Sequence, residues 1–213
     1  MKVGVLGSGE AAKALAAGFL KYGHGVTMGT REPQKLAGFA KEHSGVRTGS
    51  VADAAAFGEV LVLAVKGNAA ADVLRAAGPK NLAGKTVIDP TNAIMDAPPI
   101  DGVLQSFTGP NESLMEQLQA EFPAAHFVKA FSCVGSDTMV DPKFKEGKPT
   151  MFIAGNDDAA KKTVGAVCTQ FGWEVADMGT AVAARAIEPL AVLWCIPGFR
   201  ENNWGLRAFK MLT

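Results

Sequence analysis

The sequence has few groups from which disulfides or metal sites are built: three cysteines, three histidines and one tyrosine in 213 residues. Cys133, Cys168 and Cys195 lie far apart, have no CxxC spacing and are odd in number, so they predict neither a disulfide framework nor a zinc site. The histidines have no carboxylate or cysteine at ligand spacing, so we expect no metal. Unpaired cysteines are typical of a reducing compartment, and we expect a cytoplasmic protein.

Net charge and long apolar runs are also lacking. Lys plus Arg and Asp plus Glu number 21 each, so there is no basic field to hold a nucleic acid or an anionic membrane surface. The apolar run after Lys2 is too short for a secretory signal. The stretch from Leu190 to Phe199 contains Pro197 and reaches about half of the roughly 20 residues that a membrane span needs. We therefore expect neither nucleic acid nor a membrane as a partner.

Short β-branched runs alternate with Ala-rich segments along most of the chain. Strands are expected at KVGVLG, GVTMGT, VRTG, VLVLAV, TVID, HFVKAF, TMFIAG and WEVADMG, with helices between most of them. From Ala181 the pattern becomes helical, with a break at Pro197-Gly198 before a final short helix that contains Trp204 and Phe209. Apolar strands separated by helices predict an α/β fold, a Rossmann-like, doubly wound, mostly parallel sheet with a helical C-terminal extension.

The segment GSGEAAKALA follows the first strand and opens the first helix. Gly7, Gly9 and Ala12 fill the three small positions of GxGxx[GA], which allow a tight turn, the approach of a pyrophosphate and close helix–strand packing. The amides of residues 8–11 would face the pyrophosphate at the positive end of the helix. A simple chain reversal is the alternative, but the strand–helix context favours dinucleotide binding. Glu10 is out of place, since its carboxylate must point away from the phosphates.

The end of the second strand indicates which dinucleotide is bound. A carboxylate about 20 residues after the glycines would bind the ribose diol of NAD. Here Thr30, Arg31 and Lys35 supply a hydroxyl and two cations, which suit the 2′-phosphate of NADP. The alternative is a pair of solvated cations beside Glu32.

Further candidates follow the later strands, because open parallel sheets bind ligands at the carboxyl ends of their strands. These are residues 66–68, 90–92 and 132–133. Thr91 and Asn92 could bond a carboxamide or ribose, or could cap a turn. Lys66 could contact a phosphate, although solvation is slightly favoured.

Nucleophilic catalysis at Ser132 or Cys133 would need a base. His24, His43 and His126 all precede strands at the opposite end of the predicted sheet, so a hydrolase triad is not expected. On the late helix, Arg185 and Glu188 stand at i, i+3, which predicts an intrahelical ion pair with a structural role.

Taken together, GSGEAAKALA, MGTREPQK, VIDPTNAI, VKAFS and ARAIEPLAVLW resemble the deazaflavin (coenzyme F-420)-dependent NADP oxidoreductase family, whose relatives include the cytosolic domains of six-transmembrane metalloreductases. The resemblance runs through nearly the whole chain. It implies that NADPH lies along the glycine turn, with its 2′-phosphate at the second strand and its nicotinamide near Asn92 and residues 130–132. The expected cofactor-binding residues are Gly7, Ser8, Gly9, Glu10, Ala11, Thr30, Arg31, Lys35, Ala64, Val65, Lys66, Thr91, Asn92, Ala130, Phe131 and Ser132.

In that family a flavin or deazaflavin stacks on the nicotinamide and exchanges hydride directly. The resemblance therefore implies that positioning supplies most of the catalysis, and no catalytic acid or base residue is expected. Two alternatives remain. One is NADPH-dependent reduction of a small carbonyl or imine, which would need a proton donor. The other is a non-catalytic NADP-binding protein, since fold alone does not fix function.

Residues 1–125 are assigned to an NADP-binding Rossmann domain, and residues 126–213 to a C-terminal part that continues the sheet and ends in helices, together one compact unit. Apolar side chains from Leu190 to Leu212 crowd the final 25 residues. One face can pack on the sheet, and the remainder predicts a homodimer interface. The alternative is a helix pair folded wholly onto its own domain.

Overall fold

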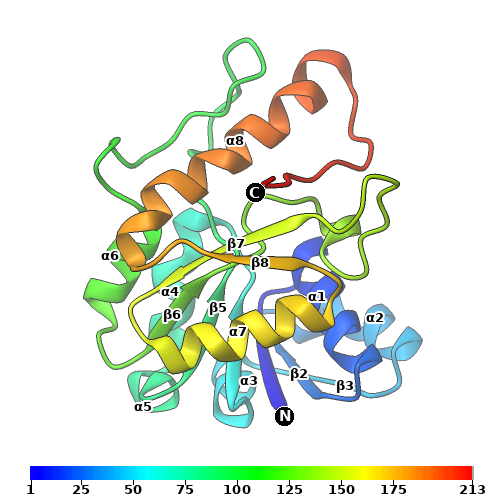
Figure 1. Cartoon of the computed structure of the whole chain (residues 1–213). Helices are drawn as coiled ribbons and strands as arrows, with labels where there is room; N and C mark the ends of the chain where they lie inside the picture. Colours follow the sequence, from blue (N-terminus) through cyan, green and yellow to red (C-terminus); the bar gives the residue numbers. More distant parts are fainter. Residues whose placement is uncertain (213) are drawn as a thin grey trace.

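The computed structural model describes residues 1–212, which form one eight-stranded sheet covered by helices (Figure 1). The strands are β1 Lys2–Leu6, β2 Gly25–Gly29, β3 Val46–Gly49, β4 Val60–Leu63, β5 Thr86–Asp89, β6 His126–Lys129, β7 Thr150–Gly155 and β8 Glu174–Asp177. The α-helices are α1 Glu10–Lys21, α2 Ala37–Glu42, α3 Val51–Phe57, α4 Ala70–Ala77, α5 Pro79–Leu82, α6 Leu114–Glu121, α7 Asp158–Gln170 and α8 Ala184–Glu201. Short 3-10 helices are η1 Pro33–Leu36, η2 Gly67–Ala69, η3 Ser136–Thr138 and η4 Ala181–Ala183.

The strand order is β3-β2-β1-β4-β5-β6-β7-β8. Neighbours from β3 to β6 pair in parallel, β7 pairs antiparallel with β6, and β8 runs parallel to β7. The predicted fold class, a mostly parallel doubly wound sheet with a C-terminal helix, is confirmed. Strands from residues 1–125 and from residues 126–212 lie in this same sheet.

Two hydrophobic clusters cover the two faces of the sheet. All four residues of β4 are buried, and they alternate between the clusters, as expected for a strand packed on both sides. Val62 belongs to the cluster that contains residues of α1 and α7, among them Phe19, and Phe171 directly after α7. Leu61 and Leu63 pack on the other face with residues of α3, α4 and α6.

Helix N-termini differ in how their first amides are satisfied. At α3, Ser50 and Asp53 form a reciprocal capping box. At α7, the side chain of Asp157 accepts a hydrogen bond from the amide of Ala160. Helix α1 begins at Gly9, which has no side chain and makes no side-chain cap. The first amides of α1 are therefore available to an anion.

Residues 90–113, between β5 and α6, form a small hairpin that we call the hairpin segment. Ile100 and Val103 exchange backbone hydrogen bonds of 2.9 and 2.8 Å around Asp101 and Gly102. Both turn residues have positive φ, 50° and 84°, as a type I′ turn requires. The tip packs on α8: a Cβ on Gly102 would lie 2.3 Å from Cγ of Arg200. The hairpin segment projects beside α8 in Figure 1.

The predicted break at Pro197-Gly198 is wrong, because α8 continues through both residues to Glu201. A proline inside a helix loses one hydrogen bond and crowds the carbonyl four residues earlier, and α8 accommodates this at both Pro189 and Pro197. Gly198 serves packing instead: a Cβ there would lie 2.4 Å from the ring of Trp204. The helix ends at Asn202, which is left-handed, with φ at 50°.

The predicted final short helix is also wrong. The described residues after Asn202 form no helix and run back beside the start of β7. The amide of Thr150 donates to the carbonyl of Phe209 at 2.9 Å, and the amide of Met211 donates to Oγ1 of Thr150 at 3.1 Å. These bonds to β7 satisfy backbone groups that a helix would have satisfied internally.

The unbroken α8 also changes the argument about membranes. By length and composition alone, residues 181–201 could cross a membrane: an 18-residue window within them has a mean hydropathy of 1.4, and 28% of that window is buried. The proline-based argument against a span therefore fails. One side of α8 nevertheless docks on the domain through charged contacts of Arg185 and Glu188 with Glu116 and Lys129.

Candidate functional site

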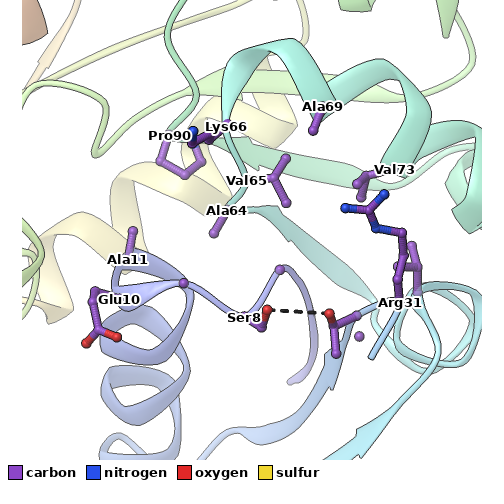
Figure 2. Close-up of a pocket in the computed structure, with 15 residues that line it drawn as sticks. Ser8, Glu10, Ala11, Arg31, Ala64, Val65, Lys66, Ala69, Val73 and Pro90 are labelled. Atoms are coloured by element: carbon purple, nitrogen blue, oxygen red, sulfur yellow. Dashed lines mark hydrogen bonds between the residues drawn. The ribbon is translucent and has the colours of Figure 1, made fainter. Parts of the chain in front are cut away.

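A cleft opens at the carboxyl ends of the strands, where the strand order reverses between β1 and β4. Such a switch point is where open α/β sheets bind ligands. Two adjoining cavities, of about 410 and 430 Å³, form the cleft and share Val65, Lys66 and Pro90. The first lies over the glycine turn and the end of β2, and Figure 2 shows its lining side chains. The second lies beneath the hairpin segment.

Gly7 makes the tight turn between β1 and α1. Its φ of 138° is accessible mainly to glycine, and a Cβ there would lie 2.1 Å from the carbonyl oxygen of Ala64. The amide of Gly7 donates to the carbonyl of Gly29 at 2.8 Å, which ties the turn to the end of β2. Gly7 is therefore required by the fold itself.

Gly9 has a different role. A Cβ on Gly9 would meet no heavy atom within 4 Å, so nothing in the protein requires a glycine there. The space above it is part of the first cavity, beside the uncapped start of α1. A pyrophosphate could approach this backbone closely, so the geometry fits a dinucleotide. Glu10 pairs with Lys13 at 2.8 Å, and its carboxylate points away from the turn in Figure 2.

At the end of β2, Thr30 and Arg31 line the first cavity. The hydroxyl of Thr30 donates to Oγ of Ser8 at 3.4 Å, across the glycine turn. Arg31 is exposed and has no ion-pair partner among residues 1–212. Lys35 instead pairs with Glu32 at 2.8 Å and faces a separate depression. The structure thus brings Arg31, and not Lys35, to the cleft.

The residues directly after β4 line the cleft. Ala64 lines the first cavity, and Val65 and Lys66 line both. Ala64 is buried, while Lys66 is largely exposed and lies 3.2 Å from Asp96 of the hairpin segment. An exposed pair of this kind adds little stability. The solvated role favoured for Lys66 fits this geometry.

Asn92 and Ser132 face each other across the ends of β5 and β6. Nδ2 of Asn92 donates to the backbone carbonyl of Ser132 at 2.8 Å. Oδ1 of Asn92 and Oγ of Ser132 are buried and have no hydrogen-bond partner among the described residues. Unpaired buried polar atoms are costly and usually await a ligand or water. They fit the amide of a nicotinamide carboxamide. Thr91 is different, because its hydroxyl donates to Asp89 at 2.6 Å.

The turn after β6 is strained. Phe131 is buried and left-handed, with φ at 60°, which is unusual for a bulky residue. Its amide donates to Sδ of Met151 at 3.0 Å, and its ring lies 6.0 Å from that of Phe171. Such strain persists only where the surroundings hold it, and here it directs the carbonyl of Ser132 toward Asn92. Ala130 is buried beside it, and residues 130–132 stand behind the cavities instead of lining them.

Groups that could act as acid, base or nucleophile are scarce at the cleft. Burial raises the pKa of the Cys133 thiol to about 11, which keeps it protonated and unreactive at neutral pH. His24, His43 and His126 lie before β2, β3 and at the start of β6, at the far end of the sheet as predicted. Within residues 1–212 no three His, Cys, Asp or Glu side chains are grouped to hold a metal.

The predicted ion pair between Arg185 and Glu188 is wrong. Arg185 makes two bonds to Glu116 of α6, at 2.9 and 2.7 Å, which lower the pKa of Glu116. Glu188 points inward to Lys129. The sequence reasoning missed Lys129, a lysine inside an apolar strand. Its position in HFVKAF was the available signal, because a charge between buried neighbours requires partners.

Comparisons with known proteins give a family match and similar solved structures. Residues 2–93 match a family model described as "NADP oxidoreductase coenzyme F420-dependent". A solved structure of a proposed F420-dependent NADP reductase from Arthrobacter sp. FB24 is 33% identical, with a TM-score of 0.92 and full coverage of both chains.

Two further likenesses extend these matches. Metalloreductase STEAP3 of Rattus norvegicus is 32% identical over 200 residues, which are 92% of this chain and 38% of that protein. The chain thus spans well under half of this curated relative. An imine reductase from Aspergillus terreus, solved with NADPH4, is 20% identical with a TM-score of 0.68, over 94% of this chain and 63% of that one. This last likeness concerns the fold alone.

Proposed function

Since the chain belongs to the family of coenzyme F420-dependent NADP oxidoreductases and is an NADP-dependent oxidoreductase, we propose that it passes hydride between NADP(H) and a flavin or deazaflavin acceptor. NADP(H) occupies the first cavity and extends its nicotinamide toward Asn92. The acceptor occupies the second cavity, under the hairpin segment. Bound NADPH supplies the hydride, and the conjugated ring of the acceptor receives it.

One observation carries the proposal: the second cavity adjoins the first and, among residues 1–212, has a mostly apolar wall without a buried ionisable side chain, and the one buried hydroxyl in it, that of Thr91, already donates to Asp89. Ile94, Met95, Leu104 and Phe199 are the larger apolar side chains in it. Its ionisable lining groups within the described residues are Lys66 and Asp96, which are exposed and paired with each other. A planar, conjugated acceptor fits such a wall and needs no acid from the protein.

The residues of the chain then act by positioning. The amides at the start of α1 hold the pyrophosphate, and Arg31 pairs with the 2′-phosphate. Asn92, which lines the second cavity, presents its unpaired Oδ1 to the carboxamide, and the Ser132 carbonyl behind it accepts from Nδ2 and so holds that side chain in place. Correct alignment of the two rings supplies most of the rate advantage.

Reduction of a carbonyl or imine is the alternative reaction. It requires a proton at the developing alkoxide or amine, delivered by a positioned donor or an ordered water. Among the described residues, Lys66 is the one basic side chain that lines the second cavity. It is exposed to solvent and is not positioned as a buried donor would be. This arrangement favours the flavin-like acceptor.

NADPH oxidation by the purified chain tests the proposal. Absorbance is followed with free FMN, free FAD or a deazaflavin as acceptor, and in parallel with a ketone and a cyclic imine. We expect turnover with at least one flavin or deazaflavin and none with the carbonyl or imine. Turnover with the imine alone would replace the proposed acceptor class. Binding of NADPH without turnover of any acceptor would contradict the proposed reaction.

We also propose that two copies of the chain associate through α8. The helix exposes Leu193 and Phe199, with 54% and 43% of their surfaces accessible, and the hairpin segment beside it exposes Ile100 at 64%. Phe199 also lines the second cavity, so a second copy over this patch would help to exclude water from it. A two-fold dimer is the common solution for such a surface.

A cytoplasmic location is proposed because the three cysteines are free.

A further inference from the structure

Lys129, the last residue of β6, is fully buried. Its Nζ donates to the backbone carbonyl of Thr91 at 2.6 Å and lies 2.7 Å from Oδ2 of Asp89 and 2.9 Å from Oε1 of Glu188. Burial alone lowers the pKa of Lys129, but the charges of Asp89 and Glu188 outweigh it, so the pKa is raised and the lysine is a cation. The hydride transfer proposed above uses none of these charges directly.

Asp89 fixes the beginning of the hairpin segment. Its Oδ1 accepts hydrogen bonds from the amide and the hydroxyl of Thr91, at 2.9 and 2.6 Å. Its Oδ2 has no hydrogen-bond partner of good geometry, so its contact with Lys129 is ionic. Lys129 thus holds both the carboxylate and the carbonyl of this first turn.

Glu188 fixes the end of the same segment. Its carboxylate accepts from the amides of Leu114 and Met115, at 3.1 and 3.0 Å, and so caps the start of α6. Because Glu188 belongs to α8, the contact also joins α8 to the base of the hairpin segment. Farther along α8, Arg200 supports the tip of the hairpin at Gly102.

Both ends of the hairpin segment therefore meet at one buried cation, although 24 residues separate Asp89 from Leu114 in the chain. Residues of this segment make up most of the wall of the second cavity. We propose that Lys129 is a positioning residue, which closes the base of the hairpin segment and so fixes the acceptor wall relative to the bound NADPH. The inference rests on the proposed function for what the wall binds.

A general stabilising role makes a different prediction. If the cluster only contributed to overall stability, its loss would weaken the whole sheet evenly. Positioning predicts a local effect, confined to residues 90–113 and the first turn of α6. The glycine turn and Arg31, which are proposed to hold the phosphates of NADPH, contact none of the three charges. Most of the NADPH affinity should therefore survive a local loosening that includes Asn92, and NADPH affinity separates the two roles.

Lys129→Met tests the inference, with Lys161→Met as the matched control. Lys161 is also a lysine between two carboxylates, 3.0 Å from Asp177 and 3.2 Å from Asp158, but it lies on α7, away from the cleft. Amide hydrogen exchange is measured for the wild type and both variants without ligand. Fluorescence titration gives the dissociation constant of NADPH for each.

In Lys129→Met we expect exchange at residues 90–115 to accelerate about tenfold or more, while exchange in β1, β2 and β4 and NADPH affinity stay within about threefold of wild type. The control should leave residues 90–115 unchanged. Unchanged exchange at 90–115, or an equal acceleration across the sheet, would overturn the inference.

Glu188→Gln provides a second variant if Lys129→Met does not fold. It keeps the shape and one carbonyl oxygen while removing the charge that α8 presents to Lys129. The same local acceleration is expected, centred on Leu114 and Met115. If neither variant folds, the three charges are needed for the stability of the whole fold, and the inference is overturned.

Steady-state kinetics add a second readout with whichever flavin or deazaflavin the wild type reduces. Lys129→Met should raise the acceptor KM about tenfold while the NADPH dissociation constant is preserved. An unchanged acceptor KM would count against positioning. If the wild type reduces no such acceptor, the proposed function fails, and the exchange measurement still decides the role of Lys129.

Discussion

Gly67 and Asn92 touch through their backbones: a Cβ built on Gly67 would lie 2.0 Å from the carbonyl oxygen of Asn92. This contact brings the turn after β4 against the turn after β5, at the border between the two cavities. The position of the Asn92 side chain thus depends on the absence of a side chain at residue 67.

Gly67→Ala should consequently displace residues 90–92. We expect a loss of about 1 to 3 kcal/mol in the free energy of unfolding, as for other forced contacts, and a larger proportional loss of hydride transfer than of NADPH binding. Denaturant unfolding and NADPH oxidation measure the two effects. Gly38→Ala is the control, since a Cβ there meets no atom within 4 Å. Wild-type kinetics in Gly67→Ala would show that the contact is not needed.

Arg31→Ser should remove the preference for NADPH over NADH. A charge-assisted bond to the 2′-phosphate contributes roughly 1.5 to 3 kcal/mol, which is about one to two decades in affinity. Fluorescence titration with both cofactors measures it. Lys35→Ser removes a cation that is paired with Glu32 outside the cleft and should change the preference little. Equal affinities of the wild type for the two cofactors would refute the assignment of Arg31.

The glycines of the first turn should separate folding from binding. Gly9→Ala places a methyl group in the open space of the cleft, so we expect weaker NADPH binding with an unchanged Tm. Gly7→Ala meets the carbonyl of Ala64 and a positive φ, so we expect a loss of roughly 3 kcal/mol in stability. Thermal unfolding of both variants measures the effect on stability, and titration with NADPH measures the effect on binding. A lower Tm in Gly9→Ala would mean that its role is structural.

Neither Ser132 nor Cys133 should be indispensable. Because the pKa of Cys133 is raised to about 11, its thiol is protonated at neutral pH and should resist alkylation in the folded protein. We expect Ser132→Ala and Cys133→Ala to retain measurable hydride transfer, with the larger loss at Ser132, where an oxygen facing Asn92 is removed. A loss near the ten-thousandfold effect of removing a triad member would indicate covalent or acid–base chemistry.

Association through α8 should appear in solution mass. Light scattering at micromolar concentration is expected to give about twice the 22.2 kDa of one chain. Leu193→Glu places a charge on the exposed face of α8 and should return the monomer without loss of fold, because Leu193 is 54% exposed. A monomer mass at every concentration would exclude the dimer.

Local signals in the sequence were sufficient to predict the sheet and most of the residues that line the first cavity. Gly7 and Gly9 act through backbone geometry, which a short motif between a strand and a helix specifies completely. Arg31 was predicted for the cleft because it lies two residues after β2, and it lines the first cavity. Lys35 stands one helical turn farther on, and its orientation toward Glu32 depends on η1, which the motif does not encode.

Long-range contacts explain what the sequence did not predict. Arg185 and Glu188 are neighbours on one helix, yet their partners lie on α6 and β6, more than 50 residues earlier in the chain. No window of local sequence contains such information.

Because both ends of the hairpin segment share one anchor, the sequence between them can be replaced. Its ends are fixed at Asp89 and Leu114 by the same buried charges, so the chain between them can change in composition or length without disturbing the sheet. A doubling of loop length costs only about 0.6 kcal/mol in closure entropy. Evolution or design can therefore alter this wall of the second cavity as a unit while the glycine turn keeps its geometry.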